Sequence, residues 1–141
     1  MVRYAKLNEN AKAPFRKNPT DAGLDFYSLE DVVVPAHSMK ILHTGITIEI
    51  PRGYCLLMKP KSRNNHLVGA GIIDAYYEPG EVLVKVVNIS DNELKINAGD
   101  GIAQGVFISI YTPEIEEVEV SHLINMSSRS VSGGILTQSK Q

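Results

Sequence analysis

The sequence predicts an all-β domain, a sandwich or barrel of many short strands. Ile46, Ile48 and Ile50 alternate with polar residues, which is the two-residue period of a half-buried strand. Turn-forming proline, glycine, asparagine and aspartate residues recur at short intervals between such apolar runs. No long segment carries the apolar stripe of an amphipathic helix. At 141 residues the chain is expected to fold as one β domain.

The other elements follow in chain order. Residues 82–87 alternate valine with other side chains and predict a mostly buried strand, and residues 102–111 favour another strand through their β-branched and aromatic content. Residues 115–120 form a short apolar run with interspersed glutamates, and residues 64–68 are the best candidate for a turn of helix. Turns are expected between these runs, at Pro35, 51–53, 79–80, 90–92, 97–99 and Pro113.

Residues 71–77, Gly-Ile-Ile-Asp-Ala-Tyr-Tyr, form the most informative stretch of the chain. Asp74 directly follows a small apolar strand, Tyr77 follows three residues later, and Pro79-Gly80 then turn the chain into the run at 82–87. We expect a hairpin that holds an acid and an aromatic ring at its base. A flat, ring-containing substrate could bind there beside a water molecule that the carboxylate activates.

Composition and charge exclude several classes of partner. The net charge is −2, and prolines interrupt the one basic cluster, Lys12–Lys17, which is expected to be a solvated turn, so a binder of duplex nucleic acid is not expected. No apolar stretch has the length of a membrane span or of a signal peptide core, so no membrane partner is expected. Cys55 is the single cysteine, cannot form an internal disulfide and is expected to be buried and inert. This fits the cytoplasm, or the interior of a host cell for a viral protein.

The last residues differ from the rest. Serine, glycine, threonine and glutamine dominate residues 126–141, so we expect a β domain over residues 1–125 and a C-terminal arm over 126–141 that is disordered when nothing is bound. The arm carries Arg129 just upstream of a Gly-Gly pair. An arm with this charge could close over an anionic ligand.

Five segments, taken together, resemble the trimeric dUTP pyrophosphatase (dUTPase) family in order and spacing. They are residues 21–25, Pro60-Lys61-Ser62-Arg63, residues 71–77, residues 99–104 and residues 129–137. The resemblance covers about Tyr4 to Thr137. It implies a distorted jelly-roll (β-clip) subunit with a flexible C-terminal arm, a homotrimer with shared active sites, and hydrolysis of dUTP to dUMP and pyrophosphate with Mg²⁺. Such a reaction keeps uracil out of DNA and supplies dUMP.

The resemblance assigns the chemistry to the central segment. Asp74 matches the catalytic aspartate that orients a water toward the α-phosphorus, a role that suits a carboxylate. Tyr77 matches the ring that packs beneath the deoxyribose and leaves no room for a 2'-hydroxyl. Backbone groups of the hairpin, Gly71, Ile72 and Ile73 on one side and Leu83 on the other, match the reader of the uracil edge.

The resemblance assigns the phosphates to polar and cationic residues. Lys61, Ser62 and Arg63 match the phosphate-binding loop, and Gln104 matches a glutamine that donates to the phosphate chain. In the arm, Arg129 matches the arginine that grips the γ-phosphate, and Ile135 falls where a side chain covers the uracil.

The resemblance implies no direct protein ligand for the metal. The substrate phosphates hold Mg²⁺, and Asp25 reaches it through a water molecule. Asp25 and Asp100 match acidic positions that orient basic groups or metal-bound waters, although capping of a strand entry or a turn explains them almost as well.

Several positions depart from the family pattern. Lys61 stands where arginine is expected, which keeps the charge but loses a bidentate grip. Gly101 also replaces an arginine. One residue is inserted between Tyr77 and Gly80, so base recognition is expected to differ from the family's usual geometry. In the arm, Ile135 replaces a phenylalanine and cannot stack on the base, which predicts a weaker or differently shaped closure.

Two other functions remain open on the same scaffold. A non-catalytic nucleotide-binding or regulatory module would fit the altered arm and phosphate loop. A dCTP deaminase would need an acid on the strand after the hairpin, where this sequence has Lys85. The presence of Asp74 and Tyr77 favours the hydrolase, because a binding module has no need of a carboxylate that orients water.

Overall fold

The fold is described from a computed structural model of the 141-residue chain. The described residues are 1–61, 67–68, 72–73 and 80–123. The chain divides into two units, Met1–Tyr111 and Thr112–Gln141. Strands dominate the described residues of the first unit, which confirms the all-β prediction, and those of the second unit contain the short helix α1 (Val120–Leu123). No helix in these parts of the chain has the length and apolar character needed to cross a membrane.

The strands of the first unit are short, as the turn spacing predicted. In chain order they are β1 (Tyr4–Lys6), β2 (Leu24–Tyr27), β3 (Val32–Val34), β4 (Ser38–His43), β5 (Ile46–Ile48), β6 (Tyr54–Lys59), β7 (Leu67–Val68), β8 (Ile72–Ile73), β9 (Leu83–Asn88), β10 (Leu94–Ile96) and β11 (Gly101–Ser109).

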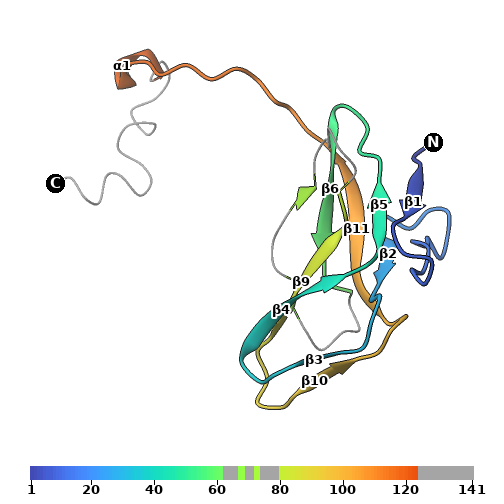
Figure 1. The fold of residues 1–141 in the computed structure, drawn as a ribbon. Coiled ribbons are helices and arrows are strands. Elements are labelled where there is room, and N and C mark those ends of the chain that lie inside the picture. Colours follow the sequence, from blue (N-terminus) through green and yellow to red (C-terminus); the bar gives the residue numbers. More distant parts are fainter. Residues whose placement is uncertain (62–66, 69–71, 74–79, 124–141) are drawn as a thin grey trace. The chain divides into compact units, whose positions relative to one another are not determined.

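These strands pair antiparallel throughout and build the distorted jelly-roll that was expected (Figure 1). The largest sheet has the order β2-β11-β6-β8, and a second sheet has the order β4-β9-β7. The pairs β1-β5 and β10-β3 complete the described pairings. Because β11 lies between β2 and β6, it joins the N-terminal part of the chain to its middle.

The core lies between the sheets and contains mainly aliphatic side chains. Its fully buried members include Phe26, Val34, Leu42, Leu56 and Ile102. Gly105 of β11 packs so closely against Leu56 and Phe26 that a Cβ atom there would lie 2.8 Å from Leu56 Cδ1. Cys55 is buried and carries a free thiol, as expected.

Most strand predictions are confirmed. Ile46 and Ile48 are both buried, as their alternation indicated, although β5 ends before Ile50. The run at 82–87 forms β9, in which Val84 and Val86 are buried.

Two local predictions were wrong. Leu67 and Val68, expected in a helical turn, form strand β7 against Val87 and Val86, so pairing with β9 overrides the local tendency, and residues 64–66 lie outside the described part of the chain. The run at 115–120 forms no strand, and Ile115 is almost fully exposed.

The expected hairpin between the Ile72-Ile73 strand and the 82–87 strand also needs correction. In the described residues, β8 pairs with β6, placing Ile73 opposite Leu56, whereas β9 pairs with β4 and β7 in the other sheet. β4 pairs along the whole of one edge of β9, and β7 pairs with its other edge at Val86 and Val87. The turn itself, residues 74–79, lies outside the described residues.

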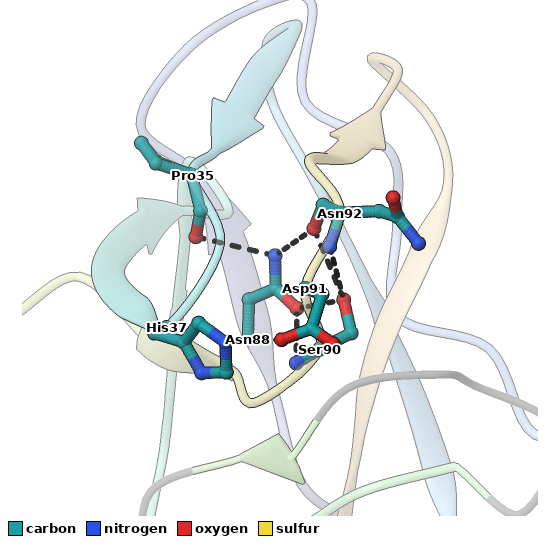
Figure 2. Close-up of polar contacts among 6 residues, drawn as sticks. All are labelled: Pro35, His37, Asn88, Ser90, Asp91 and Asn92. Atoms are coloured by element: carbon teal, nitrogen blue, oxygen red, sulfur yellow. Dashed lines mark hydrogen bonds and ion pairs between the residues drawn. The ribbon is translucent and has the colours of Figure 1, made fainter.

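A buried asparagine fixes one corner of the second sheet (Figure 2). Asn88, at the end of β9, is 1% exposed, and its Nδ2 donates to the carbonyl oxygens of Val34, Pro35 and Asn92. Its Oδ1 accepts hydrogen bonds from the backbone N and the Oγ of Ser90. All of its hydrogen-bonding capacity is therefore used within the protein, and the side chain ties β9 to the ends of β3 and β10.

An exposed pair lies beside this corner. His37 adopts a left-handed backbone conformation with φ of 55°, and its Nε2 lies 2.6 Å from Asp91 Oδ1. The two side chains link the turn before β4 to the turn before β10, since each belongs to one of these turns.

Candidate functional site

Three of the five segments named from the sequence meet at one end of the largest sheet. Gln104 of β11 lies opposite Asp25 of β2 on one side and opposite Lys59 of β6 on the other. Residues directly opposite in an antiparallel pair point to the same face. Asp25 and Gln104 therefore lie side by side, with the chain leaving β6 toward Lys61 next to them.

Lys61 and Asp25 form an ion pair. The Nζ of Lys61 lies 2.9 Å from Asp25 Oδ2, and the two side chains are 29% and 22% exposed. Partial burial makes such a pair stronger than one on the open surface, where water and salt screen the charges. Asp25 is itself fixed, because its backbone exchanges two hydrogen bonds with Phe15.

Gln104 is held by the end of β6. Its Nε2 donates to the carbonyl oxygen of Pro60 at 2.9 Å, which leaves the side-chain oxygen directed at Gly23. A Cβ atom at position 23 would overlap this oxygen. The glycine in the 21–25 segment therefore has a packing reason: it makes room for Gln104.

These side chains line a cavity of about 500 Å³. Its wall is formed by Lys17, Asp21, Ala22, Gly23, Asp25, Lys61 and Gln104. The volume is within the range of small-molecule sites, and the wall offers charged and amide groups of the kind that bind polar ligands. The cavity thus brings together Asp25, Lys61 and Gln104 from distant parts of the sequence.

From the sequence, Lys17 was not identified as part of the cavity wall, and Asp21 was included in the 21–25 segment without a role. The carboxylate of Asp21 accepts hydrogen bonds from the backbone N and the Nδ2 of Asn18, and Arg16 Nε donates to the Asp21 carbonyl oxygen. These bonds fold the turn back on itself directly before Gly23. The sequence indicates a turn at Asn18-Pro19-Thr20-Asp21, which runs into the 21–25 segment. A turn by itself does not predict where the side chain of Lys17 lies.

The two acidic positions with open roles differ in their surroundings. Asp25 binds the ammonium of Lys61, whereas Asp100 Oδ2 accepts a hydrogen bond from the backbone N of Asn97 at 2.8 Å. The Asp100 side chain caps the turn that leads into β11, and it does not belong to the cavity wall.

A second polar cluster anchors the start of β9. Glu81 accepts hydrogen bonds from His43 Nδ1 at 2.9 Å and from the backbone N of Gly45 at 2.8 Å. The hydrogen bond to Glu81, followed by its charge, raises the pKa of His43. Burial by itself would raise the pKa of Glu81, but the hydrogen bonds from His43 and Gly45 outweigh it, and the net pKa lies below the usual value.

The remaining expected site residues are not brought to the cavity by the described structure. Ile72 and Ile73 lie in β8, and Leu83 begins β9, half exposed and opposite His43. Seven others lie outside the described residues: Ser62, Arg63, Gly71, Asp74, Tyr77, Arg129 and Ile135.

The donors on the cavity wall were compared with the needs of a divalent cation. Within the described residues, no group of three or more histidine, cysteine, aspartate or glutamate side chains could hold a metal ion. Asp21 and Asp25 are the carboxylates on the wall. Mg²⁺ is commonly bound by one or two carboxylates together with substrate phosphates and water, so this donor set fits a cation that arrives with a phosphate ligand.

The sequence matches one family of known proteins. The family model described as dUTPase matches residues 9–134. The chain is 36% identical to the deoxyuridine 5'-triphosphate nucleotidohydrolase of fowlpox virus, over 94% of this chain and 93% of the relative.

Solved structures agree. A Staphylococcus bacteriophage 80alpha dUTPase mutant with dUpNHpp is similar with a TM-score of 0.81 and 27% identity, over 92% of this chain and 93% of that one. A mutant dUTPase from phage phi11 of S. aureus, described with a structural Mg(II) ion, is similar with a TM-score of 0.75 and 28% identity, over 84% of this chain and 97% of that one.

Proposed function

The chain belongs to the dUTPase family, and on that premise we propose that it hydrolyses dUTP to dUMP and pyrophosphate. The observation that carries this proposal is the cavity in which Asp25, Lys61 and Gln104 meet. These residues come from three of the five segments that resemble the family. Their cationic and amide donors suit a polyanionic substrate.

The triphosphate binds at this cavity. Lys61 offers an ammonium that Asp25 already orients, and Gln104, beside Asp25, has a second amide hydrogen besides the one that it donates to the Pro60 carbonyl oxygen. Lys17 adds a further positive charge at the same wall. Ser62 and Arg63, which follow Lys61 directly, extend the donor set along the phosphate chain.

Mg²⁺ is the proposed cofactor. Asp25, with Asp21 beside it, would hold the cation through water, while the substrate phosphates supply the direct ligands. When bound, the cation offsets the negative charge that the phosphates carry. Lys61 forms an ion pair with Asp25, and this pair keeps the carboxylate in a fixed position.

The chemical step falls to Asp74. Its carboxylate accepts a hydrogen bond from the attacking water and stabilises the charge that this water develops. Tyr77 packs beneath the sugar and excludes a 2'-hydroxyl by its bulk. Backbone groups of Gly71, Ile72, Ile73 and Leu83 read the uracil edge, because a wrong exocyclic group would leave a buried polar atom unpaired at a cost of about 1–3 kcal/mol.

The C-terminal arm completes the site. Arg129 grips the γ-phosphate, and Ile135 covers the base by apolar contact. A chain that ends at Ser128 is expected to lose most of its turnover; unchanged turnover would remove the arm from the mechanism.

The active enzyme is a homotrimer. One face of the second sheet supports an assembly, because Met39 and Ile41 are 50% and 53% exposed and Leu83 lies on the same face, opposite His43. The same face also carries Lys85, opposite Ile41, and His43, so it is mixed, and its exposed apolar side chains favour contact with another protein surface. We place the enzyme in the cytoplasm or in the interior of a host cell, in keeping with its free, buried thiol.

Replacement of Asp74 tests the mechanism. Asp74→Asn keeps the shape of the side chain but cannot stabilise the charge on the water, so kcat is expected to fall by about 10²- to 10⁴-fold while dUTP still binds. Pyrophosphate release and equilibrium binding of a dUTP analogue measure the two effects separately. Asp91→Asn is the matched control, since Asp91 pairs with His37 and does not line the cavity. Near-full turnover in Asp74→Asn would rule out this role.

A further inference from the structure

Gly101 lies directly against the end of the Lys61 side chain. A Cβ atom at position 101 would lie 3.1 Å from Lys61 Nζ, 3.5 Å from Cδ and 3.7 Å from Cε. The three nearest atoms to this missing Cβ all belong to Lys61. We propose that Gly101 is a positioning residue: the space that it leaves open lets the Lys61 ammonium reach Asp25 and face the phosphate cavity. This inference rests on the proposed function and deepens it.

The backbone does not require a glycine at this position. Gly99, two residues earlier, has a left-handed φ of 87° with nothing near its missing Cβ, so its glycine serves the turn. Gly101 is not among the described glycines with positive φ. Its neighbourhood therefore indicates that side-chain space, and not backbone conformation, favours glycine at position 101.

The pairing of β11 with β2 explains why Gly101 lies close to the Lys61 side chain. A bulge between Gly101 and Ala103 shifts the register of β11 against β2, and Gly101 lies opposite Tyr27 while Gln104 lies opposite Asp25. The first residue of β11 therefore lies against the Lys61 side chain. Bulges commonly re-aim neighbouring groups at functional sites.

The arrangement orders a side chain that would otherwise move freely. An ammonium has three donors, and Asp25 takes up one of them at 2.9 Å. The remaining donors are available to a ligand in the cavity, whose wall includes Lys61. Because Asp25 is tied to Phe15 by two backbone hydrogen bonds, the lysine is held against a fixed partner, and less ordering remains to be done when phosphate binds.

A double-mutant cycle tests this proposal. The Cβ atom of Gly101→Ala would make the Lys61 ammonium shift by a few tenths of an ångström, which should loosen its pair with Asp25 and raise the KM for dUTP by about threefold, with kcat within about twofold. In a Lys61→Met background, where the ammonium is already absent, Gly101→Ala should have no further effect. Lys95→Met, on the exposed side of β10, controls for the loss of a positive charge elsewhere.

A second readout does not depend on turnover. Acetylation of Lys61 by an amine-reactive reagent, followed by mass spectrometry, should be several-fold faster in Gly101→Ala than in the native chain. Asp25→Asn should speed it similarly, and this variant serves the same purpose if Gly101→Ala folds poorly. Equal effects of Gly101→Ala in both backgrounds, or unchanged Lys61 reactivity, would overturn the positioning role. A native chain that releases no pyrophosphate from dUTP would instead refute the proposed function, and the reactivity measurement would still decide the role of Gly101.

Discussion

Within the described residues, a second group of the protein holds four of the five polar side chains on the cavity wall, all except Lys17. Asp25 holds Lys61, the Pro60 carbonyl holds Gln104, and Asn18 holds Asp21. Lys61 and Gln104, two donors that would meet a phosphate, are thus oriented before the ligand arrives. Preorganised donors cost less entropy on binding than side chains that must be ordered by the ligand.

Gly23→Ala tests this preorganisation. The new methyl group would overlap Gln104 Oε1, so Gln104 must move and break its hydrogen bond to Pro60. Loss of that bond is expected to lower the free energy of unfolding by about 1 kcal/mol. The KM for dUTP should rise by about threefold to tenfold, the range for one charge-assisted contact.

Thermal unfolding and steady-state kinetics measure the two effects of Gly23→Ala. The variant Gln104→Ala supplies the control, because it removes Oε1 and Cδ, the two atoms nearest to the new methyl group, and leaves only the Cβ atom of residue 104 at 3.3 Å. Adding Gly23→Ala to Gln104→Ala should then change neither stability nor KM. A further loss in the double variant would show that the glycine serves some other purpose.

Among the elements, β11 does most to build the site. It pairs with β2 on one side and β6 on the other, so it brings the 21–25 segment and the Lys61 segment to its own Gln104. A change in the register of either pair by one residue would turn the facing side chains to the opposite face of the sheet. The geometry of the cavity therefore depends on the packing of Gly105 against Leu56 and Phe26, which fixes how closely these strands approach.

The start of β9 depends on a titratable pair, His43 and Glu81. The pKa of His43 is raised above the ordinary histidine value of 6.5, so its contribution to stability is fully present below about pH 6.5 and is lost as the pH rises through the raised pKa. The pKa of Glu81 is lowered below 4.5, so its contribution is present above about pH 4.5 and is lost as the pH falls through the lowered pKa.

His43→Gln is therefore expected to cost most stability between about pH 4.5 and pH 6.5, and progressively less at higher pH. Denaturant unfolding of the native chain and of the variant at several pH values measures this difference. His122→Gln, which removes an exposed histidine far from Glu81 in sequence, is the matched control. A stability difference that grows between pH 7 and pH 9 would contradict the assigned pair.

The strands were largely predictable, while their partners were not. The alternation around Ile46 and Ile48 identified a half-buried strand because that pattern is local. The pairing of β8 with β6, in place of β9, could not be found in this way, because it depends on which strand edges the rest of the chain leaves free. The exposed run at 115–120 shows the same limit, since apolar content alone does not supply a partner strand.

The residues of the site were also only partly predictable from the sequence. The segments containing Asp25, Lys61 and Gln104 were recognised from motif spacing, and the structure brings these three side chains together. Lys17 reaches the same wall only because Asn18 and Asp21 fold the turn back, and no local pattern predicts this. The contact between Gly101 and Lys61 likewise depends on tertiary structure, because forty residues of chain separate them.

On the scale of the whole molecule, local charge matters more than net charge. The chain carries a net charge of −2, yet we propose that it binds a polyanion. Lys17 and Lys61 on the cavity wall, with Mg²⁺ carried by the substrate, supply the attraction where it is needed. The absence of a broad basic surface in the sequence also explains why nucleic acid is not an expected partner.

The trimer is predicted from the family resemblance, and the exposed apolar side chains on β4 and β9 are the proposed contact face. Light scattering coupled to size-exclusion chromatography should give a mass of three times the 15.5 kDa of one chain. Ile41→Lys places a charge in that face and should lower the mass, whereas Val33→Lys, at an exposed position of β3, should leave it unchanged. A native chain with the mass of one subunit would contradict the trimer.

Pyrophosphate release from a panel of nucleoside triphosphates with Mg²⁺ measures whether this chain cleaves dUTP selectively. We predict rapid release from dUTP and little from UTP, dTTP or dCTP, because the sugar and base are selected by sterics and by backbone hydrogen bonding. Binding of dUTP without pyrophosphate release would point to a non-catalytic module. Ammonia release from dCTP would point to a deaminase, and either result would contradict the account.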